Sequence, residues 1–165
     1  MKRNKFVPAL ALFLLTCLFF GGCTRAERVD YSALNRRLKR IAPAYEFNED
    51  EIFFNDSVYY AFYSVLSRDD MLLTMTEDEE LRLISVSLTA SGNDTSPEFR
   101  NAFLSLAAAA ADAFAPPAEA EGLKRSIGGY RDILFTERFE KAESGRYTVE
   151  LFSDPVGVSV IISIS

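Results

Sequence analysis

The chain has 165 residues, carries 18 Lys and Arg against 24 Asp and Glu, and contains neither His nor Trp. The lack of histidine excludes an imidazole general base, the Ser-His and Cys-His nucleophile pairs, and imidazole metal ligands. The acidic balance would repel a phosphate backbone, so nucleic acid is not an expected partner.

The first 23 residues have the three-part layout of an export signal. Three of the first five residues are Lys or Arg, an almost unbroken apolar run covers residues 6–20, and two glycines precede Cys23. As a helix the apolar run would be about 22 Å long, which is short for a bilayer crossing. The run therefore fits a signal peptide better than a membrane span.

The segment Phe20-Gly21-Gly22-Cys23 resembles the lipobox of bacterial lipoproteins, in which an apolar residue and two small ones precede the lipidated cysteine. The resemblance implies that residues 1–22 are removed and that the Cys23 thiol carries a diacylglycerol. Residues 23–28 would then be the anchor and a short tether. Thr24 in place of Asp implies the outer membrane where the cell has one, and the cell membrane otherwise. An uncleaved anchor and an ordinary secreted protein are the alternatives.

The remaining body suits one domain over residues 29–165. Three of the 18 basic residues and none of the 24 acidic ones lie in residues 1–22, which leaves 15 basic and 24 acidic and a net charge of −9. Cys17 and Cys23 are the only cysteines, so the body has no disulfide, thiol nucleophile or thiolate metal site. We expect no catalytic residues, no cofactor and no metal.

A helix is expected to follow Asp30, a suitable N-cap, and to end before Pro43. Its apolar residues recur at helical spacing: Tyr31, Leu34, Leu38 and Ile41. The opposite face carries the only basic cluster of the body: Arg36, Arg37, Lys39 and Arg40. This cluster either contacts anionic lipid headgroups close to the anchor or is a solvated face that balances the acidic domain.

Four antiparallel strands are expected between Tyr45 and Ala90, separated by turn residues. Their predicted ranges are 45–54, 57–67, 71–76 and 81–90. In the last of them strict alternation predicts one buried face: Ile84, Val86, Leu88 and Ala90.

The second of these strands is apolar on both faces, so it is either central with a layer on each side or leaves one aromatic face for a partner. The candidate partner-binding residues, with Phe53 and Phe54 beside them, are Tyr59, Tyr60, Phe62 and Tyr63. Aromatic side chains are enriched at interface hot spots. The alternative is that these rings belong to the core.

Two helices should follow the loop at residues 91–96. Thr95 or Ser96 caps the first, and Pro116-Pro117 ends it. Its predicted buried stripe is Phe99, Phe103, Leu106, Ala110 and Phe114. The second helix covers about residues 118–127 and is closed by Gly128-Gly129.

The C-terminal part predicts two or three strands. Ile133-Leu134-Phe135 indicates an extended segment, although residues 130–143 could equally be a covering loop. Strands are expected over 146–153 and 156–165, and the apolar final strand should be buried within the sheet. Strands in runs, interrupted by paired helices, predict an α+β fold. We expect one mainly antiparallel sheet of about six strands, with an N-terminal helix and a two-helix insertion packed on it.

No motif of the body indicates chemistry. The acidic runs at residues 49–51 and 77–80 lack the ligand spacing of a calcium loop, and the loop at 91–96 has the composition of a helix cap. We therefore predict a membrane-anchored, extracytoplasmic, non-catalytic binding module, with membrane lipid through Cys23 and an envelope protein as its candidate partners. The alternatives are an assembly subunit of an envelope complex and a small carboxylate-based hydrolase.

Overall fold

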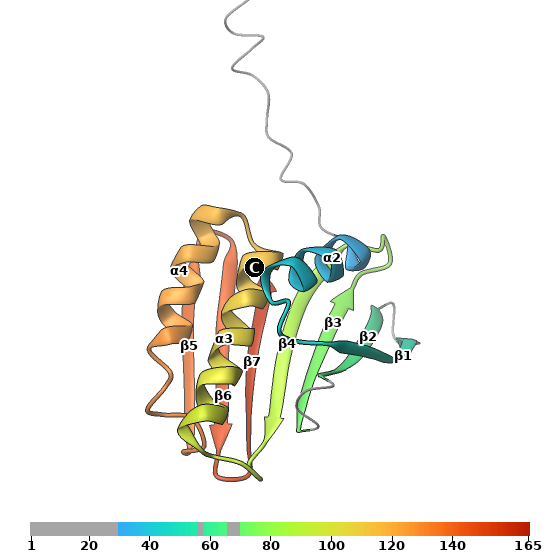
Figure 1. Cartoon of the computed structure of the whole chain (residues 1–165). Helices are drawn as coiled ribbons and strands as arrows, with labels where there is room; N and C mark the ends of the chain where they lie inside the picture. The colour runs from blue at the N-terminus through green and yellow to red at the C-terminus, as the bar shows by residue number, and fades with distance from the viewer. Residues whose placement is uncertain (1–29, 56–57, 66–69) are drawn as a thin grey trace, which may run out of the picture.

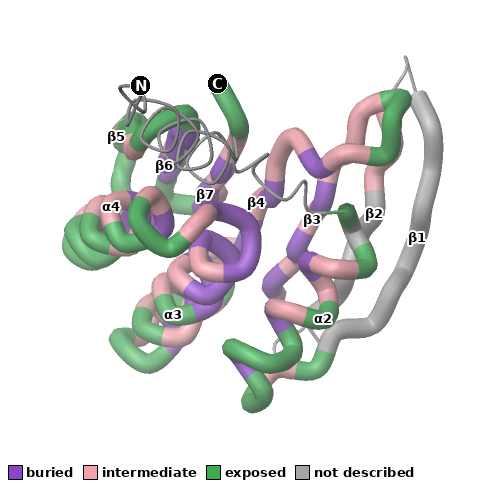
Figure 2. Tube along the Cα trace, turned by 90° about the horizontal axis from the view of Figure 1, so that it is seen from above, coloured by how far each residue is buried: buried purple, intermediate pink, exposed green. Residues whose placement is uncertain are grey.

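The computed structural model describes residues 30–55, 58–65 and 70–165, with only the backbone for residues 31, 47–55 and 61–65. Seven strands form one sheet in the order β1-β2-β3-β4-β7-β6-β5, and every neighbouring pair is antiparallel. The three described helices all lie on one face of this sheet (Figure 1 and Figure 2). The predicted α+β class and single antiparallel sheet are confirmed, with seven strands where about six were expected.

The first four strands form a meander. They are β1 (Phe47–Asn55), β2 (Val58–Val65), β3 (Met71–Glu77) and β4 (Leu83–Ser91). The chain then crosses to the other edge of the sheet through α3 (Pro97–Phe114) and α4 (Pro117–Gly128).

The last three strands return from that edge toward the middle of the sheet. They are β5 (Arg138–Ser144), β6 (Tyr147–Asp154) and β7 (Gly157–Ile164). Strand β7 pairs with β4 on one side and with β6 on the other, and Val158, Val160 and Ile162 are buried. The prediction that the final strand lies within the sheet is confirmed.

Helix α2 (Tyr31–Ile41) begins where the sequence predicts. The Asp30 carboxylate accepts a hydrogen bond from the Ala33 N–H at 2.7 Å, which satisfies one of the free donors of the first turn. Leu34 and Leu38 are fully buried. Ile41 was expected in the same stripe but is 42% exposed, because it is the last residue of the helix and the chain turns away after it.

Helix α3 lies between α2 and α4 and contributes the largest helical share of the core. Of the two candidate caps, the structure selects Ser96, whose hydroxyl accepts from the Phe99 N–H at 3.2 Å while Pro97 takes the first helical position. The five predicted stripe residues are all buried. Four further alanines are buried with them, and their small side chains allow neighbouring elements to approach closely.

The predicted alternation of β4 is wrong at its start. The ladder pairs Thr76 with Ser85 but Glu77 with Leu83, so Ile84 is an extra residue in a β-bulge. A bulge moves every residue before it to the other face. Leu83 is therefore buried, and Ile84 is only half-buried.

The extended segment expected at Ile133-Leu134-Phe135 is also wrong. Consecutive turns cover residues 129–135, and they bury Tyr130, Leu134 and Phe135 without a ladder. The Phe135 backbone has a φ of +61°, and its ring lies 5.9 Å from the ring of Phe99. Residues 130–143 are thus half covering loop and half strand, since β5 begins only at Arg138.

Candidate functional site

The predicted lipid anchor lies outside the described residues, as do the export segment and the tether to residue 29. The side chains of the acidic run at residues 49–51 and of Phe62 and Tyr63 lie outside them too. In the part of the chain that the structure does describe, no helix has the length and apolar character to span a bilayer.

The sheet face opposite the helices is rich in hydroxyl groups. The alternation that buries Val86, Leu88 and Ala90 under the helices turns the intervening residues of β4 to this open face, and β3 and β7 behave in the same way. On β3, β4 and β7 the hydroxyl side chains of this face are Thr74, Thr76, Ser85, Ser87, Thr89, Ser159 and Ser163. The Thr89 and Ser159 hydroxyls lie 3.1 Å apart, which joins β4 to β7 across this face.

An open groove of about 370 Å³ lies on this face at the β6–β7 turn. It is lined by Thr89, Arg138, Phe152, Ser153, Asp154, Gly157, Val158 and Ser159.

Two exposed phenylalanines stand beside the groove. Phe139 of β5 is directly opposite Phe152 of β6, and their ring centroids are 4.9 Å apart. Phe139 is 56% exposed and Phe152 44% exposed. Val156, in the adjoining turn, is more exposed still. The two rings make an apolar patch beside the groove.

The polar groups of the groove are held by local contacts. The Asp154 Oδ1 accepts hydrogen bonds from the N–H groups of Val156 (2.7 Å) and Gly157 (2.8 Å), which fixes the β6–β7 turn. The Ser153 hydroxyl donates to the Ile133 carbonyl. On the same face, Lys141 pairs with Glu150 at 3.2 Å.

The aromatic strand predicted as a partner site is β2, second from one edge of the sheet. Tyr59 and Tyr60 are half-buried. The register sets Tyr59 opposite Glu77 and Tyr60 opposite Thr76, so Tyr60 lies on the open face beside Thr76. Neighbouring residues of a strand point to opposite faces, so Tyr59 and Tyr60 do not share one surface.

The basic cluster of α2 is divided as well. Arg37 is partly buried and donates a hydrogen bond at 3.5 Å to the Ala113 carbonyl, at the C-terminal end of α3, where a cation is favourable. Arg36, Lys39 and Arg40 are exposed. Only these three are placed to meet another surface.

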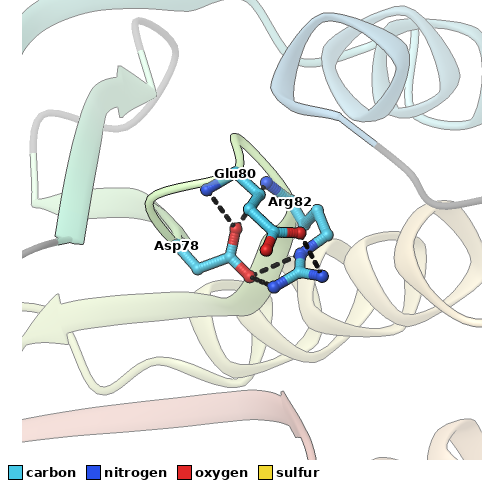
Figure 3. A network of polar contacts seen from close by, with 3 residues as sticks. All are labelled: Asp78, Glu80 and Arg82. Atoms are coloured by element: carbon cyan, nitrogen blue, oxygen red, sulfur yellow. Dashed lines mark hydrogen bonds and ion pairs between the residues drawn. The ribbon is translucent and has the colours of Figure 1, made fainter.

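Within the acidic run at residues 77–80, Asp78 and Glu80 form a turn network with Arg82 (Figure 3). The Asp78 carboxylate accepts hydrogen bonds from the N–H groups of Glu80 and Arg82, each at 3.0 Å, and a third from the Arg82 guanidinium at 2.6 Å. The Arg82 side chain also pairs with Glu80. The Arg82 hydrogen bond holds the pKa of Asp78 below its ordinary value.

Two other groups have shifted pKa values. Hydrogen bonds to Asp112 and then to Glu121 raise the pKa of Lys124, which ties α4 to α3. Burial raises the pKa of the Tyr130 hydroxyl, and the Glu140 charge adds to this shift. Across residues 30–55, 58–65 and 70–165, no three potential metal ligands gather at one place.

The chain matches no model of a known protein family, no curated protein and no solved structure. Phe139 and Phe152 were not among the predicted site residues, although a sequence signal for them exists. Ser144-Gly145 marks a turn, and Gly145 adopts a φ of +60°. A hairpin with its turn at these two residues sets Phe139 opposite Phe152. The sequence does not show this pairing unless residues 138–144 are first recognised as a strand.

Proposed function

We propose that this chain is an extracytoplasmic bacterial lipoprotein held by Cys23, and that its α+β domain is a non-catalytic module that binds an envelope protein through the open face of the sheet. The observation that carries the proposal is the exposed pair Phe139 and Phe152 beside the groove. The export segment and the lipobox resemblance support the location.

A protein suits this surface better than a small molecule does. Small-molecule sites are usually concave and enclose most of the ligand, whereas this groove is open. Aromatic anchors surrounded by polar side chains are typical of protein interfaces. Here two phenylalanines lie next to Thr89, Arg138 and Ser159.

The alternative that the chain is an assembly subunit of an envelope complex remains, provided that the subunit binds through the open face of the sheet. Edge-strand addition is less favoured at β5, which carries four exposed charged residues: Arg138, Glu140, Lys141 and Glu143. Charged side chains on an edge strand discourage pairing with another chain. The hydrolase alternative needs two acids across a cleft, whereas Asp154 is the one carboxylate that lines the groove, and its Oδ1 is engaged by two backbone donors.

Mass spectrometry of the mature N-terminus tests the anchor. The wild type should begin at Cys23 and carry the added mass of a diacylglycerol thioether. Cys23→Ala should retain residues 1–22 and carry no lipid. A wild-type protein recovered unmodified with its leader intact would contradict the anchor.

Site-specific photocrosslinking in intact cells tests the binding face. A photoreactive residue at Phe152 or Ser159 should capture a defined protein, whereas the same residue at Arg125, exposed on α4 on the other side of the molecule, should not. Capture in a fixed stoichiometry would favour the assembly subunit. Equal labelling from Arg125 and from the groove positions would contradict a specific open-face site.

A further inference from the structure

We infer that the exposed basic face of α2, made of Arg36, Lys39 and Arg40, rests on the anionic lipid headgroups of the membrane that holds the anchor. The inference deepens the proposed function, because it relies on the lipid at Cys23 to bring α2 close to a bilayer. It also assigns a membrane-binding surface to the folded domain itself, in addition to the lipid on Cys23.

The three side chains form one surface. At about 100° per residue they fall within an arc of roughly 100° on the helix. Leu34 and Leu38, both fully buried, lie on the opposite side. The core contact of α2 thus turns the three cations outward together, while Arg37 stays against α3.

Within the part of the chain that the structure describes, no carboxylate pairs with this surface. No ion pair joins Arg36, Lys39 or Arg40 to any other described residue. By contrast, Arg82, Lys124 and Lys141 each pair with a carboxylate. Three unpaired cations on one short helix are therefore free to meet an external anion.

The covalent distance to the anchor is short. Six residues lie between Cys23 and Asp30, the cap of α2, so the seven Cα–Cα steps that join the two residues span at most about 25 Å when fully extended. Exposed charges interact over a Debye length of about 8 Å at physiological ionic strength. A tether of this length lets α2 come within that range of the headgroups.

Electrostatics also decides which side of the domain faces the membrane. The body has a net charge of −9, so an anionic bilayer repels most of its surface. The exposed face of α2 instead presents three cations together on one helix, and docking there orients the whole domain. Figure 1 shows α2 across one end of the sheet and the β6–β7 turn at the other end. Docking through α2 therefore holds the groove away from the membrane, where an envelope protein can reach it.

Vesicle partition of the mature chain, residues 23–165 with Cys23→Ser, tests the surface without the lipid. The probes are vesicles of phosphatidylcholine alone and of phosphatidylcholine mixed with phosphatidylglycerol. The protein should bind the mixed vesicles, release at high salt, and ignore phosphatidylcholine alone. Because each basic residue near an anionic surface is worth about fivefold in partition, the triple variant Arg36→Gln/Lys39→Gln/Arg40→Gln should bind at least about tenfold more weakly.

A second triple variant controls for net charge. Arg125→Gln/Arg131→Gln/Lys141→Gln removes the same three charges from exposed positions on α4, on the turn that follows it and on β5, and should reduce partition far less. Both triples should melt like the wild type. Equal losses for the two triples, or a wild type that does not bind the mixed vesicles, would overturn the inference. Mass spectrometry of Cys23 tests the anchor separately, so the failure of one does not imply the failure of the other.

Discussion

Gly122 in the middle of α4 lies against Ser144 at the end of β5, and a Cβ on Gly122 would approach the Ser144 Cβ to 2.9 Å and its hydroxyl more closely still. Rotation of the serine side chain cannot relieve the Cβ contact. We expect Gly122→Ala to lower the free energy of unfolding by about 1 kcal/mol, because overpacking of about 1–3 kcal/mol exceeds a helix-propensity gain of about 1 kcal/mol. Urea denaturation measures the difference.

Gly128, in the last turn of the same helix, is the matched control. A Cβ there meets nothing within 4 Å, so Gly128→Ala should leave stability unchanged or raise it by up to about 1 kcal/mol. Ser144→Gly should restore part of the stability that Gly122→Ala loses. If Gly122→Ala is as stable as Gly128→Ala, the close packing of α4 on β5 is wrong.

The N-cap of α3 gives a second test. Ser96→Ala removes the hydroxyl that accepts from the Phe99 N–H and should cost about 1 kcal/mol of unfolding free energy. Thr95→Ala should cost little, because the interaction described for Thr95 uses its carbonyl, which accepts from Arg100. Thermal melts of the two variants decide between the caps. A larger loss for Thr95→Ala would assign the cap to that residue.

Tyr130 is buried, and no described group hydrogen-bonds to its hydroxyl. A buried polar group without a partner is destabilising, so Tyr130→Phe should raise the unfolding free energy by about 1 kcal/mol at neutral pH. Tyr45→Phe is the control with the opposite sign, since the Tyr45 hydroxyl donates to the Ala102 carbonyl at 3.1 Å. A loss of stability in Tyr130→Phe would mean that the Tyr130 hydroxyl has a partner.

The raised pKa of Tyr130 predicts that the protein loses stability at alkaline pH. Burial raises the pKa of Tyr130 above its ordinary value of 10.0, with Glu140 contributing, so the folded state keeps this proton longer than the unfolded state does. Its contribution to stability is present below pH 10 and is lost as the pH rises through the folded pKa. The wild type should therefore lose more stability above pH 10 than Tyr130→Phe does, as denaturation at several pH values would measure.

The lowered pKa of Asp78 predicts that its contribution to stability is lost at acid pH. The hydrogen bond from Arg82 lowers the pKa of this carboxyl below its ordinary value of 3.8, so the pairing stabilises the fold above that pH and is lost as the pH falls through the folded pKa. The stability advantage of the wild type over Asp78→Asn should shrink below about pH 4. Glu79→Gln, in the same turn, is the control. A constant difference across that range would contradict the role of the Asp78–Arg82 pair.

Regular periodicity made much of this fold predictable. The stripe of α3 and the alternation of β6 and β7 follow directly from spacings of 3.6 and 2, because each element buries one face. The bulge at Ile84 could not be found in this way, since Leu83 and Ile84 are equally apolar candidates for one core position. The turns that bury Leu134 and Phe135 contain an apolar run that resembles a strand.

The open face was harder to predict than the elements that form it. It depends on the strand order, in which β7 inserts between β4 and β6, and local sequence does not encode which strands pair. That order brings Thr89 next to Ser159 across 70 positions of sequence. It also depends on the register of β5, which sets Phe139 opposite Phe152, and β5 has no buried alternation from which that register could be predicted. Long-range pairing thus decides the site, whereas local pattern decides the elements.

The position of β7 makes the C-terminus essential for folding. Deletion of residues 160–165 removes Val160 and Ile162 from the core and leaves β4 and β6 without most of their common partner. We expect the truncated chain not to fold, because these losses, at about 2–5 kcal/mol for each large buried side chain, approach the whole stability of a small domain. Deletion of Ser165 alone removes one backbone hydrogen bond to Arg146 and a hydroxyl contact with Thr148, and this variant should still melt cooperatively. Circular dichroism melts of the two truncations test the point, and a soluble, cooperatively melting protein that ends at residue 159 would refute it.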